Sequence, residues 1–386
     1  MKKLYIFNPE HELALVNNDI NYMPKSNIAQ MIRDLTVLPL WFNSDCYLKD
    51  SYVNDEWKKN AEKLNLHYWL VDEINYKNVT ELNVWGWNRT VCNILKNKGI
   101  NTNFLPNDEQ LARIRDLTNR QTAIAAFLFL KQKMPAYHFP ETPLALTSEY
   151  LVRKFLHRRF KSVLKTPFSC SGKGIFINQQ VTKKFKEFTQ SVIKEQKCMI
   201  AEEYLEVIQN FAMEFQITDN QVYFVGYSLF ETNGKAYAEN VLMPDGEIEF
   251  FLEKFISKDL LNTVKQAFIE FIEQKIIPDY NGFLGVDMFV YEKNNSFLLN
   301  PCVEINLRPT MGLAAHEFYK NFVNSNKKGV FAIDFFKNSE ELFFDHQKRF
   351  AENPPIFENS RLLSGYISLC PVFENTFFRI RVEIDK

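Results

Sequence analysis

Short apolar runs alternate with amphipathic stretches along roughly the first 105 residues. Residues 55–64 and 90–98 carry the apolar spacing of helices and lie between these runs. Strands that alternate with helices in this way are typical of a parallel α/β layer. We therefore expect a Rossmann-like N-terminal α/β domain over residues 1–107. Its predicted strands cover residues 4–8, 35–42, 66–71 and 82–87.

Polar loops follow two of these predicted strands, at residues 8–12 and 86–89. Ligands of parallel sheets gather in the loops at the carboxyl ends of the strands. A His beside acidic residues is as often only a surface ion pair, so that alternative stays open. The residues that we expect to select a substrate there are Asn8, His11, Glu12, Asn88 and Arg89.

The rest of the chain divides at changes of pattern. Residues 108–133 are helical, and three prolines between 135 and 143 then interrupt the pattern. A polar linker follows residue 338, and strands are expected at 365–372 and 376–384. The predicted domains after the first are residues 108–200, 201–338 and 339–386. Other predicted strands are residues 163–165, 175–177, 198–201, 211–217 and 222–230, with helices at 183–195 and 258–275 and a hairpin at 285–307.

Composition excludes several classes of protein. The chain has 386 residues, which suggests two or three domains at about 150 residues each. Its 46 basic and 47 acidic residues give a net charge of −1, without the basic excess of a nucleic-acid or membrane-surface protein. The longest apolar run, residues 123–130, is far shorter than the ~20 residues that span a bilayer.

Cysteine and histidine give no sign of a structural metal or a disulfide framework. The six cysteines lie far apart without a CxxC pair, and the six histidines are scattered. We expect a cytoplasmic protein, with small molecules or peptides as partners and neither nucleic acid nor membrane. A homodimer remains compatible with the sequence.

The predicted hairpin carries the most informative polar residues. Positions 287 and 304 add to 591, so a turn between Asn295 and Ser296 places Asp287 opposite Glu304. Cross-strand partners have Cβ atoms about 5 Å apart, where two carboxylates repel unless a cation lies between them. Carboxylate and amide oxygens suit Mg²⁺, which predicts a metal site at Asp287, Glu304 and Asn306.

Alternation along the second strand of the hairpin places Arg308 on the same face, where it would contact a phosphate. A solvated strand face with a surface ion pair is the alternative, and Pro301 requires an edge or a bulge.

A loop of small residues, 169–174, follows Lys165 between two predicted strands. Its backbone N–H groups could surround a phosphate, with charge from lysine side chains. The spacing is not that of a Walker loop, and a plain hairpin turn is the alternative. A further strand ends in Glu202-Glu203-Tyr204-Leu205, where the backbone could pair with an adenine, or which could be only a core strand reaching the surface.

In this order, the features resemble the ATP-grasp superfamily across roughly residues 113–312. The resemblance rests on Lys165 with its small-residue loop, the acidic strand end, Phe211-Ala212-Met213-Glu214, Gly285-Val286-Asp287 and the Glu-x-Asn-x-Arg sequence from Glu304. It implies a two-subdomain ATP-grasp fold behind the N-terminal domain, and ATP with Mg²⁺ as cofactors.

The resemblance also implies roles for residues. Lys165 and Arg308 would stabilise charge during catalysis, and Arg120 would replace an upstream phosphate-binding lysine of the family. The acidic ribose contact of the family is absent, and Gln209-Asn210 stands near its place. The implied nucleotide-binding residues are Arg120, Lys165, Ser169, Ser171, Gly172, Lys173, Gly174, Glu202, Glu203, Tyr204, Leu205, Asn210 and Glu214.

Most members of the family join a carboxylate to an amine through an acylphosphate. We therefore expect an ATP-dependent, Mg²⁺-dependent carboxylate–amine ligase that releases ADP and phosphate. A kinase that phosphorylates a small molecule, and a nucleotide-responsive binding protein without turnover, are the alternatives.

Overall fold

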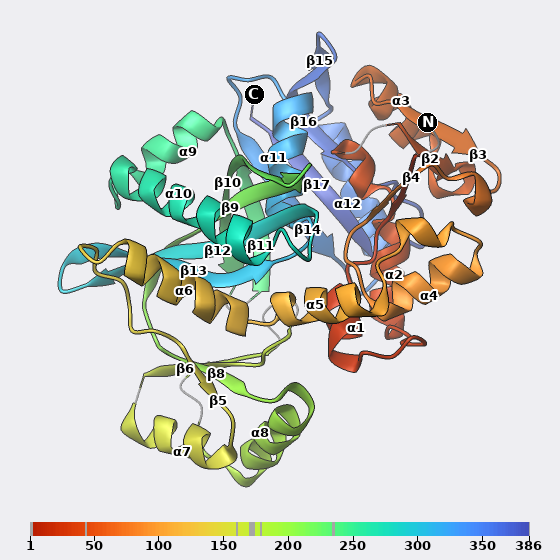
Figure 1. Cartoon of the computed structure of the whole chain (residues 1–386). Helices are drawn as coiled ribbons and strands as arrows, with labels where there is room; N and C mark the ends of the chain where they lie inside the picture. The colour runs from red at the N-terminus through yellow and green to blue at the C-terminus, as the bar shows by residue number, and fades with distance from the viewer. Residues whose placement is uncertain are drawn as a thin grey trace.

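The computed structural model describes residues 3–42, 45–159, 161–169, 174–177, 180–233 and 236–385. In this part of the chain, helices and strands form three sheets. A small lobe carries one sheet, and the other two belong to the larger body (Figure 1).

The N-terminal sheet has four parallel strands in the order β3-β2-β1-β4. The predicted parallel α/β layer is therefore confirmed. The strands are β1 (Lys3–Ile6), β2 (Cys46–Lys49), β3 (Tyr68–Val71) and β4 (Glu81–Val84), and the helices are α1 (His11–Asn17), α2 (Ser26–Asp34), α3 (Asp55–Lys63) and α4 (Arg89–Asn97).

One predicted strand of this unit is wrong. Residues 35–42 contain the buried 3₁₀ helix Leu38–Trp41 instead, and the second strand begins at Cys46. Pro39 lacks a backbone N–H and is excluded from a central strand, whereas the first turn of a helix accepts it.

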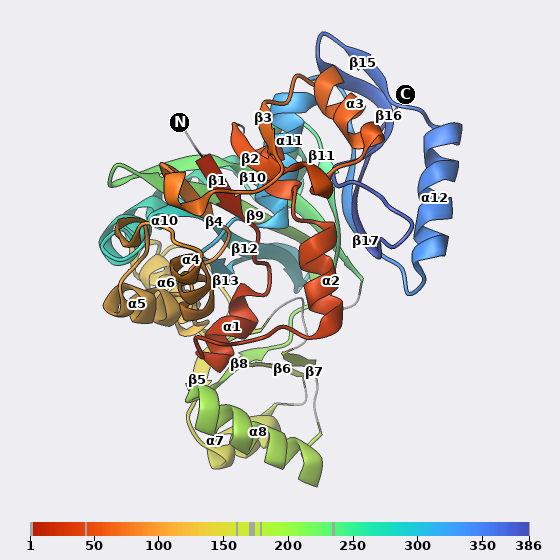
Figure 2. The same cartoon turned by 90° about the vertical axis from the view of Figure 1, so that its right-hand side faces the viewer.

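The small lobe contains an antiparallel sheet in the order β5-β8-β6-β7. Both helices of the lobe lie on one side of this sheet (Figures 1 and 2). Their apolar residues form a separate core with the sheet. The elements are β5 (Leu144–Leu146), α7 (Glu149–Arg158), β6 (Ser162–Lys165), β7 (Ile175–Ile177), α8 (Lys183–Gln196) and β8 (Met199–Glu203).

Two helices, α5 (Asp108–Thr118) and α6 (Gln121–Lys133), occupy the segment that the pattern predicts as helical. The break falls at Asn119, whose backbone is extended. The N–H of Arg120 then donates to the carbonyl of Pro167, 3.1 Å away, before β7 begins. The break therefore fixes the backbone of Arg120 against the small lobe.

The third sheet has nine antiparallel strands in the order β13-β12-β9-β10-β11-β14-β17-β16-β15. Helices α6 and α10 (Lys258–Lys275) pack their apolar residues on one face of β9, β12 and β13, leaving the other face for the site. The strands are β9 (Val207–Thr218), β10 (Gln221–Asn233), β11 (Ala236–Leu242), β12 (Gly282–Lys293), β13 (Ser296–Asn306), β14 (Gly329–Phe335), β15 (Ile356–Glu358), β16 (Arg361–Ser368) and β17 (Phe378–Ile384), and the remaining helices are α9 (Asp245–Leu252), α11 (Met311–Phe322) and α12 (Ser339–Glu352).

The C-terminal region differs from the prediction in two elements. Its predicted strands are present as β16 and β17, but the predicted polar linker after residue 338 contains α12, which the Asn338 side chain caps, and the short strand β15. The strands pack against the N-terminal unit, where the indole N–H groups of Trp41 and Trp57 both donate to the carbonyl of Leu369.

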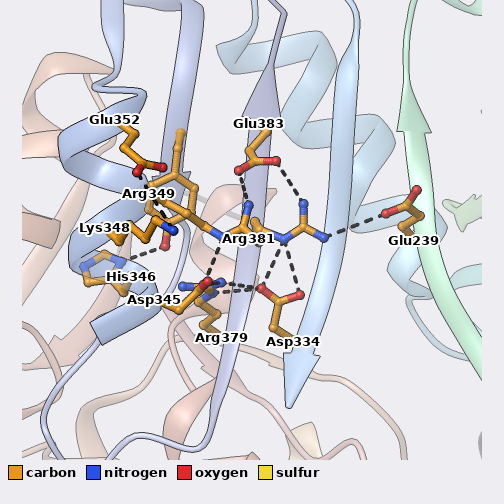
Figure 3. Close-up of polar contacts among 11 residues, drawn as sticks. Glu239, Asp334, Asp345, His346, Lys348, Arg349, Glu352, Arg379, Arg381 and Glu383 are labelled. Atoms are coloured by element: carbon orange, nitrogen blue, oxygen red, sulfur yellow. Dashed lines mark hydrogen bonds and ion pairs between the residues drawn. The ribbon is translucent and has the colours of Figure 1, made fainter. Parts of the chain in front are cut away.

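A network of charges holds α12 against the sheet (Figure 3). Arg379 of β17 is fully buried and binds Asp334 of β14 and Asp345 of α12. His346 of α12 contacts the hydroxyl of Tyr366 and, at 3.1 Å, Glu56 of α3. Removal of one partner of a buried ion pair costs about 3–5 kcal/mol of folding stability. These contacts therefore hold α12 both to the large sheet and to α3 of the N-terminal unit.

Candidate active site

The hairpin β12–β13 pairs Asp287 directly with Glu304. The predicted pair is present, but the turn is not where the prediction placed it. Lys293 pairs with Ser296, and the register next to the turn would set Asp287 opposite Cys302. The pairing shifts between Asp287 and Phe289, opposite the segment that contains Pro301, and β13 is the edge strand of the sheet. The proline therefore has both the bulge and the edge position that it needs.

Alternation along β13 separates the polar from the apolar residues as predicted. Ile305 and Leu307 are buried in the core. Glu304, Asn306 and Arg308 line a cavity on the opposite face, together with Asp287. The Nδ2 of Asn306 donates to Oδ2 of Asp287 at 3.2 Å, and Nη2 of Arg308 donates to Oδ1 of Asn306 at 3.4 Å.

Burial and the neighbouring Glu304 raise the pKa of the Asp287 carboxyl to about 7. Arg308 and Arg120 lower this pKa, but they do not offset the effects that raise it. Two carboxylates and an amide oxygen are hard ligands that fit Mg²⁺, once Asn306 Oδ1 exchanges its bond with Arg308 for the ion. No group of three or more His, Cys, Asp or Glu residues arranged for a metal occurs among the described residues.

Arg120 joins the small lobe to the hairpin. Its Nη1 donates to the carbonyl of Thr166 at 2.6 Å and to Oγ of Ser169 at 2.8 Å, and its Nη2 donates to Oε2 of Glu304 at 2.8 Å. The side chain is only 4% exposed. The guanidinium predicted for a phosphate is therefore held at Glu304, one of the carboxylates predicted to bind a metal.

Lys165 and Glu202 form a second buried ion pair. Their strands β6 and β8 are neighbours, and Nζ lies 2.7 Å from Oε2 of Glu202. The side chains are 6% and 13% exposed. The backbone N–H of Glu141 donates to Glu203 at 3.1 Å, and Tyr204 and Leu205 connect β8 to β9.

The predicted phosphate loop is described only at its ends. Ser169 contacts Arg120, and a Cβ at Gly174 would lie 2.1 Å from Oγ1 of Thr166, so this position requires glycine. Ser171, Gly172 and Lys173 lie outside the described residues. Their predicted contacts with phosphate stay predictions.

Glu214 of β9 is buried and lines the same cavity as Asp287. The hydroxyl of Thr310 donates to its Oε1 at 2.7 Å. A Cβ at Gly285 or Gly312 would come within 2.7 Å or 2.6 Å of its carboxylate oxygens, so the two glycines admit this side chain. Burial raises the pKa of the Glu214 carboxyl to about 8.

We expect Glu214→Gln to stabilise the ligand-free protein more at pH 9 than at pH 5. Between about pH 4.5 and 8 the folded protein keeps the proton that the unfolded chain has lost. The stability of the unsubstituted protein therefore falls through this window, by at most about 1.4 kcal/mol per unit, and glutamine cannot ionise. Urea unfolding at both pH values checks this, with the exposed Glu292→Gln as control. An equal effect of Glu214→Gln at both values would contradict the assignment.

The predicted substrate loops meet each other. Asn8 Nδ2 donates to the carbonyl of Gly86 at 2.7 Å, and the N–H of Gly86 donates to Oδ1 of Asn8 at 3.1 Å. Asn88 caps α4, and its Nδ2 lies 3.3 Å from Nδ1 of His11. A Cβ at Gly86 would overlap the His11 ring, so glycine permits this packing.

Glu12 connects these loops to the hairpin through an ion pair with Arg308. Burial alone would raise the pKa of the Glu12 carboxyl, but Arg308 and His11 lower it below the ordinary value. Burial lowers the pKa of His11 to about 4, so the ring is neutral at pH 7. Arg89 lies 3.9 Å from Asp108, and its predicted role in selecting a substrate stays a prediction.

The cavity that Asp287, Glu304, Asn306 and Arg308 line has a volume of about 310 Å³. Of the predicted residues, its walls contain Arg120, Ser169, Asn210, Glu214, Asp287, Glu304, Asn306 and Arg308. Lys165, residues 202–205 and the substrate loops around His11 lie outside the set of residues that line it.

Sequence reasoning missed several wall residues. Thr310 and Gly312 closely follow the Glu-x-Asn-x-Arg sequence, and Trp85 directly follows β4. Their positions next to predicted site residues could have identified them as residues of the cavity wall. Met31, Ser228 and Asn240 gave none, because only the packing of distant elements brings them here.

No protein-family model and no curated protein matches this chain. Solved structures do. N5-carboxyaminoimidazole ribonucleotide synthetase from Thermus thermophilus superposes with a TM-score of 0.51 at 11% identity, covering 92% of this chain and 91% of that one. The chain has the ATP-grasp fold.

Two further structures show the same likeness. N5-carboxyaminoimidazole synthetase from Staphylococcus aureus, complexed with ADP, has a TM-score of 0.50 at 12% identity and covers 100% of this chain and 93% of that one. Biotin carboxylase from Campylobacter jejuni, in a complex with β,γ-ATP, has a TM-score of 0.50 at 12% identity and covers 100% and 87%. No helix in the described ranges is long and apolar enough to cross a membrane.

Proposed function

We propose that the protein is an ATP-dependent ligase that joins a carboxylate to an amine and releases ADP and phosphate. The observation that carries this proposal is the cross-strand pair Asp287–Glu304, which shares one cavity wall with Asn306, Arg120 and Arg308. Phosphoryl transfer needs such a cluster of metal ligands and cations around the phosphates. The nucleotide complexes of the similar structures from Staphylococcus aureus and Campylobacter jejuni support it.

The proposal divides the chain as the sequence suggests. Residues 1–107 form a Rossmann-like domain, which the parallel order β3-β2-β1-β4 supports. Residues 108–200 and 201–338 would form the two ATP-grasp subdomains. The small lobe has its own apolar core, whereas α5 and α6 pack into the core beneath the large sheet. Residues 339–386 would pack on the ATP-grasp domain; their apolar residues share a core with the N-terminal unit and with α11. The spread of six cysteines without a CxxC pair favours a cytoplasmic protein.

ATP would lie between the small lobe and the face of β9, β12 and β13. Lys165 would bind the phosphates, the loop 169–174 would surround them, and residues 202–205 would pair with the adenine. Asn210 and Glu214 would complete the nucleotide site. In the ligand-free protein Lys165 binds Glu202 and Arg120 binds Glu304, so nucleotide and metal must exchange these ion pairs for their own contacts. Such an exchange would make nucleotide and Mg²⁺ bind cooperatively.

Asp287, Glu304 and Asn306 would hold Mg²⁺. When bound, the ion neutralises the charge that develops on the phosphoryl oxygens. Arg308 and Lys165 would stabilise the same charge and keep the reacting groups in line.

Chemically, a substrate carboxylate oxygen would attack the γ-phosphorus of ATP, and the bond to ADP would break. The amine would then attack the carbonyl carbon of the acylphosphate, forming a C–N bond while the C–O bond to phosphate breaks and the nitrogen loses a proton. This route requires positioned charge and no protein nucleophile.

His11 provides a test of substrate selection. We propose that Asn8, His11, Glu12, Asn88 and Arg89 help to select the acid. We expect His11→Ala to raise the KM for the acid about tenfold, because His11 lies beside Glu12, the ion-pair partner of the cavity residue Arg308, and to leave the KM for ATP unchanged. Steady-state kinetics with each substrate varied in turn measures both. Equal increases in the two KM values would contradict a selecting role.

The proposed function is tested by screening for phosphate release. The protein is incubated with Mg·ATP and pools of amino acids, small acids and peptides, with mass detection of the joined product. We expect phosphate release only when an acid and an amine are both present. A phosphorylated hydroxyl compound as the product would favour a kinase, and bound ATP without any turnover would favour a binding protein.

A further inference from the structure

A second cavity, of about 470 Å³, adjoins the cavity of the candidate site. The two share Pro9, Met31 and Ser169 in their walls. Residues of α1 and α2 line one side of the second cavity, and residues of α8 line another. Figure 2 shows α1 and α2 in the larger body and α8 in the small lobe below them. The cavity therefore lies where the N-terminal unit meets the small lobe.

The wall of the second cavity consists mostly of apolar residues, with two acidic side chains. Six of the apolar wall residues are Leu13, Val16, Ile28, Phe168, Phe188 and Val192. The charged side chains in the wall are Glu10 and Glu195, and no Lys, Arg or His contributes to it among the described residues. The cavity therefore complements a molecule with an apolar body and a positive charge.

Glu10 adds an independent observation. Its Oε2 is buried and has no hydrogen-bond partner in the described part of the chain. Burial raises the pKa of this carboxyl to about 7. A buried carboxylate without a partner is costly, and a cationic ligand would remove that cost.

We propose that this second cavity binds the amine substrate, and that this substrate carries its amine on an apolar body. This inference rests on the proposed ligase function. The shared wall gives the amine a short path to the reacting centre, because Oγ of Ser169 accepts from Arg120 at 2.8 Å and Arg120 binds Glu304 at 2.8 Å. The bound ammonium would first release one proton to solvent. The neutral nitrogen would then attack the acyl carbon from this side, forming the C–N bond as phosphate leaves, and lose its second proton to solvent.

The test is calorimetric titration of the full chain with 2-phenylethylamine and its uncharged analogue 2-phenylethanol. Glu195→Gln changes an exposed residue of α8 in the cavity wall, and Glu10→Gln changes the carboxyl whose Oε2 is buried. Glu187→Gln, also exposed on α8 but outside the wall, is the matched control. Ser191→Trp places a large side chain in the wall.

We expect the amine to bind about tenfold more tightly than the alcohol, the contribution of about one partly buried ion pair. Both cavity variants should reduce this preference several-fold, Glu187→Gln should keep it, and Ser191→Trp should weaken both ligands. Equal affinity for amine and alcohol, or an equal loss in Glu187→Gln, would overturn the proposal.

Titration of the same samples with Mg·ADP separates the two proposals. Binding of Mg·ADP without any preference for the amine would overturn the amine cavity alone. A preference for the amine without binding of Mg·ADP would overturn the proposed ligase and leave a cationic-ligand site.

Discussion

Asp287→Asn is expected to abolish Mg·ATP turnover and to leave the fold intact. Asp287 and Glu304 are direct cross-strand partners, and both are needed to balance the charge of one divalent ion. Asparagine keeps the shape of the side chain and can still contact Asn306, but it removes one of the two charges. Loss of several kcal/mol of transition-state stabilisation corresponds to a decrease in kcat/KM of about a thousandfold.

The control for this variant lies on the same strand. Glu292→Gln removes a charge from an exposed position at the far end of β12. We expect it to retain full turnover, and both variants to unfold cooperatively. Unchanged turnover in Asp287→Asn would remove Asp287 from the metal site.

Lys165→Met is expected to lower the affinity for Mg·ADP by about a hundredfold and also to destabilise the protein. Lys165 is almost fully buried and pairs with Glu202 at 2.7 Å. Methionine fills the space of the lysine stem but leaves the Glu202 carboxylate buried without its partner, which costs about 3–5 kcal/mol. A charged hydrogen bond to a phosphate contributes about 1.5–3 kcal/mol to binding.

A double variant separates stability from binding. Lys165→Met with Glu202→Gln removes both charges and should recover most of the lost stability, without recovering nucleotide affinity. Lys161→Gln, which changes an exposed residue just before β6, is the control for net charge. Thermal unfolding and titration with Mg·ADP measure the two effects. Full affinity in the double variant would show that Lys165 contacts no phosphate.

Local patterns predicted the elements that local interactions fix. The helix over residues 258–275 has its predicted bounds, because apolar spacing and the Ser257 cap both define it. Alternation along the hairpin predicted which residues share a face, but not the turn, which lies one residue earlier, at Asn294 and Asn295 in the left-handed conformation that asparagine tolerates. The bulge between Asp287 and Phe289 is what brings Asp287 opposite Glu304. The shared face of Asp287, Glu304 and Asn306 could therefore be predicted from the sequence.

Long-range packing decided what the sequence did not predict. Glu12 and Arg308 are 296 positions apart, and no local pattern indicates their ion pair. The helix α12 has a polar sequence, and Arg379 and Tyr366 on distant strands stabilise it through Asp345 and His346. At Pro39 a local feature was overlooked instead. The apolar run around it resembles a strand in hydrophobicity, but proline lacks the backbone N–H that a central strand needs, and the segment forms a 3₁₀ helix.

The most direct test of the ligase mechanism follows an oxygen atom. Once the screen identifies a carboxylate and an amine, the carboxylate is labelled with ¹⁸O, and the released phosphate is analysed by mass spectrometry. An acylphosphate intermediate predicts ADP as the nucleotide product and one ¹⁸O atom in each released phosphate. AMP with pyrophosphate, or ¹⁸O retained wholly in the joined product, would contradict it.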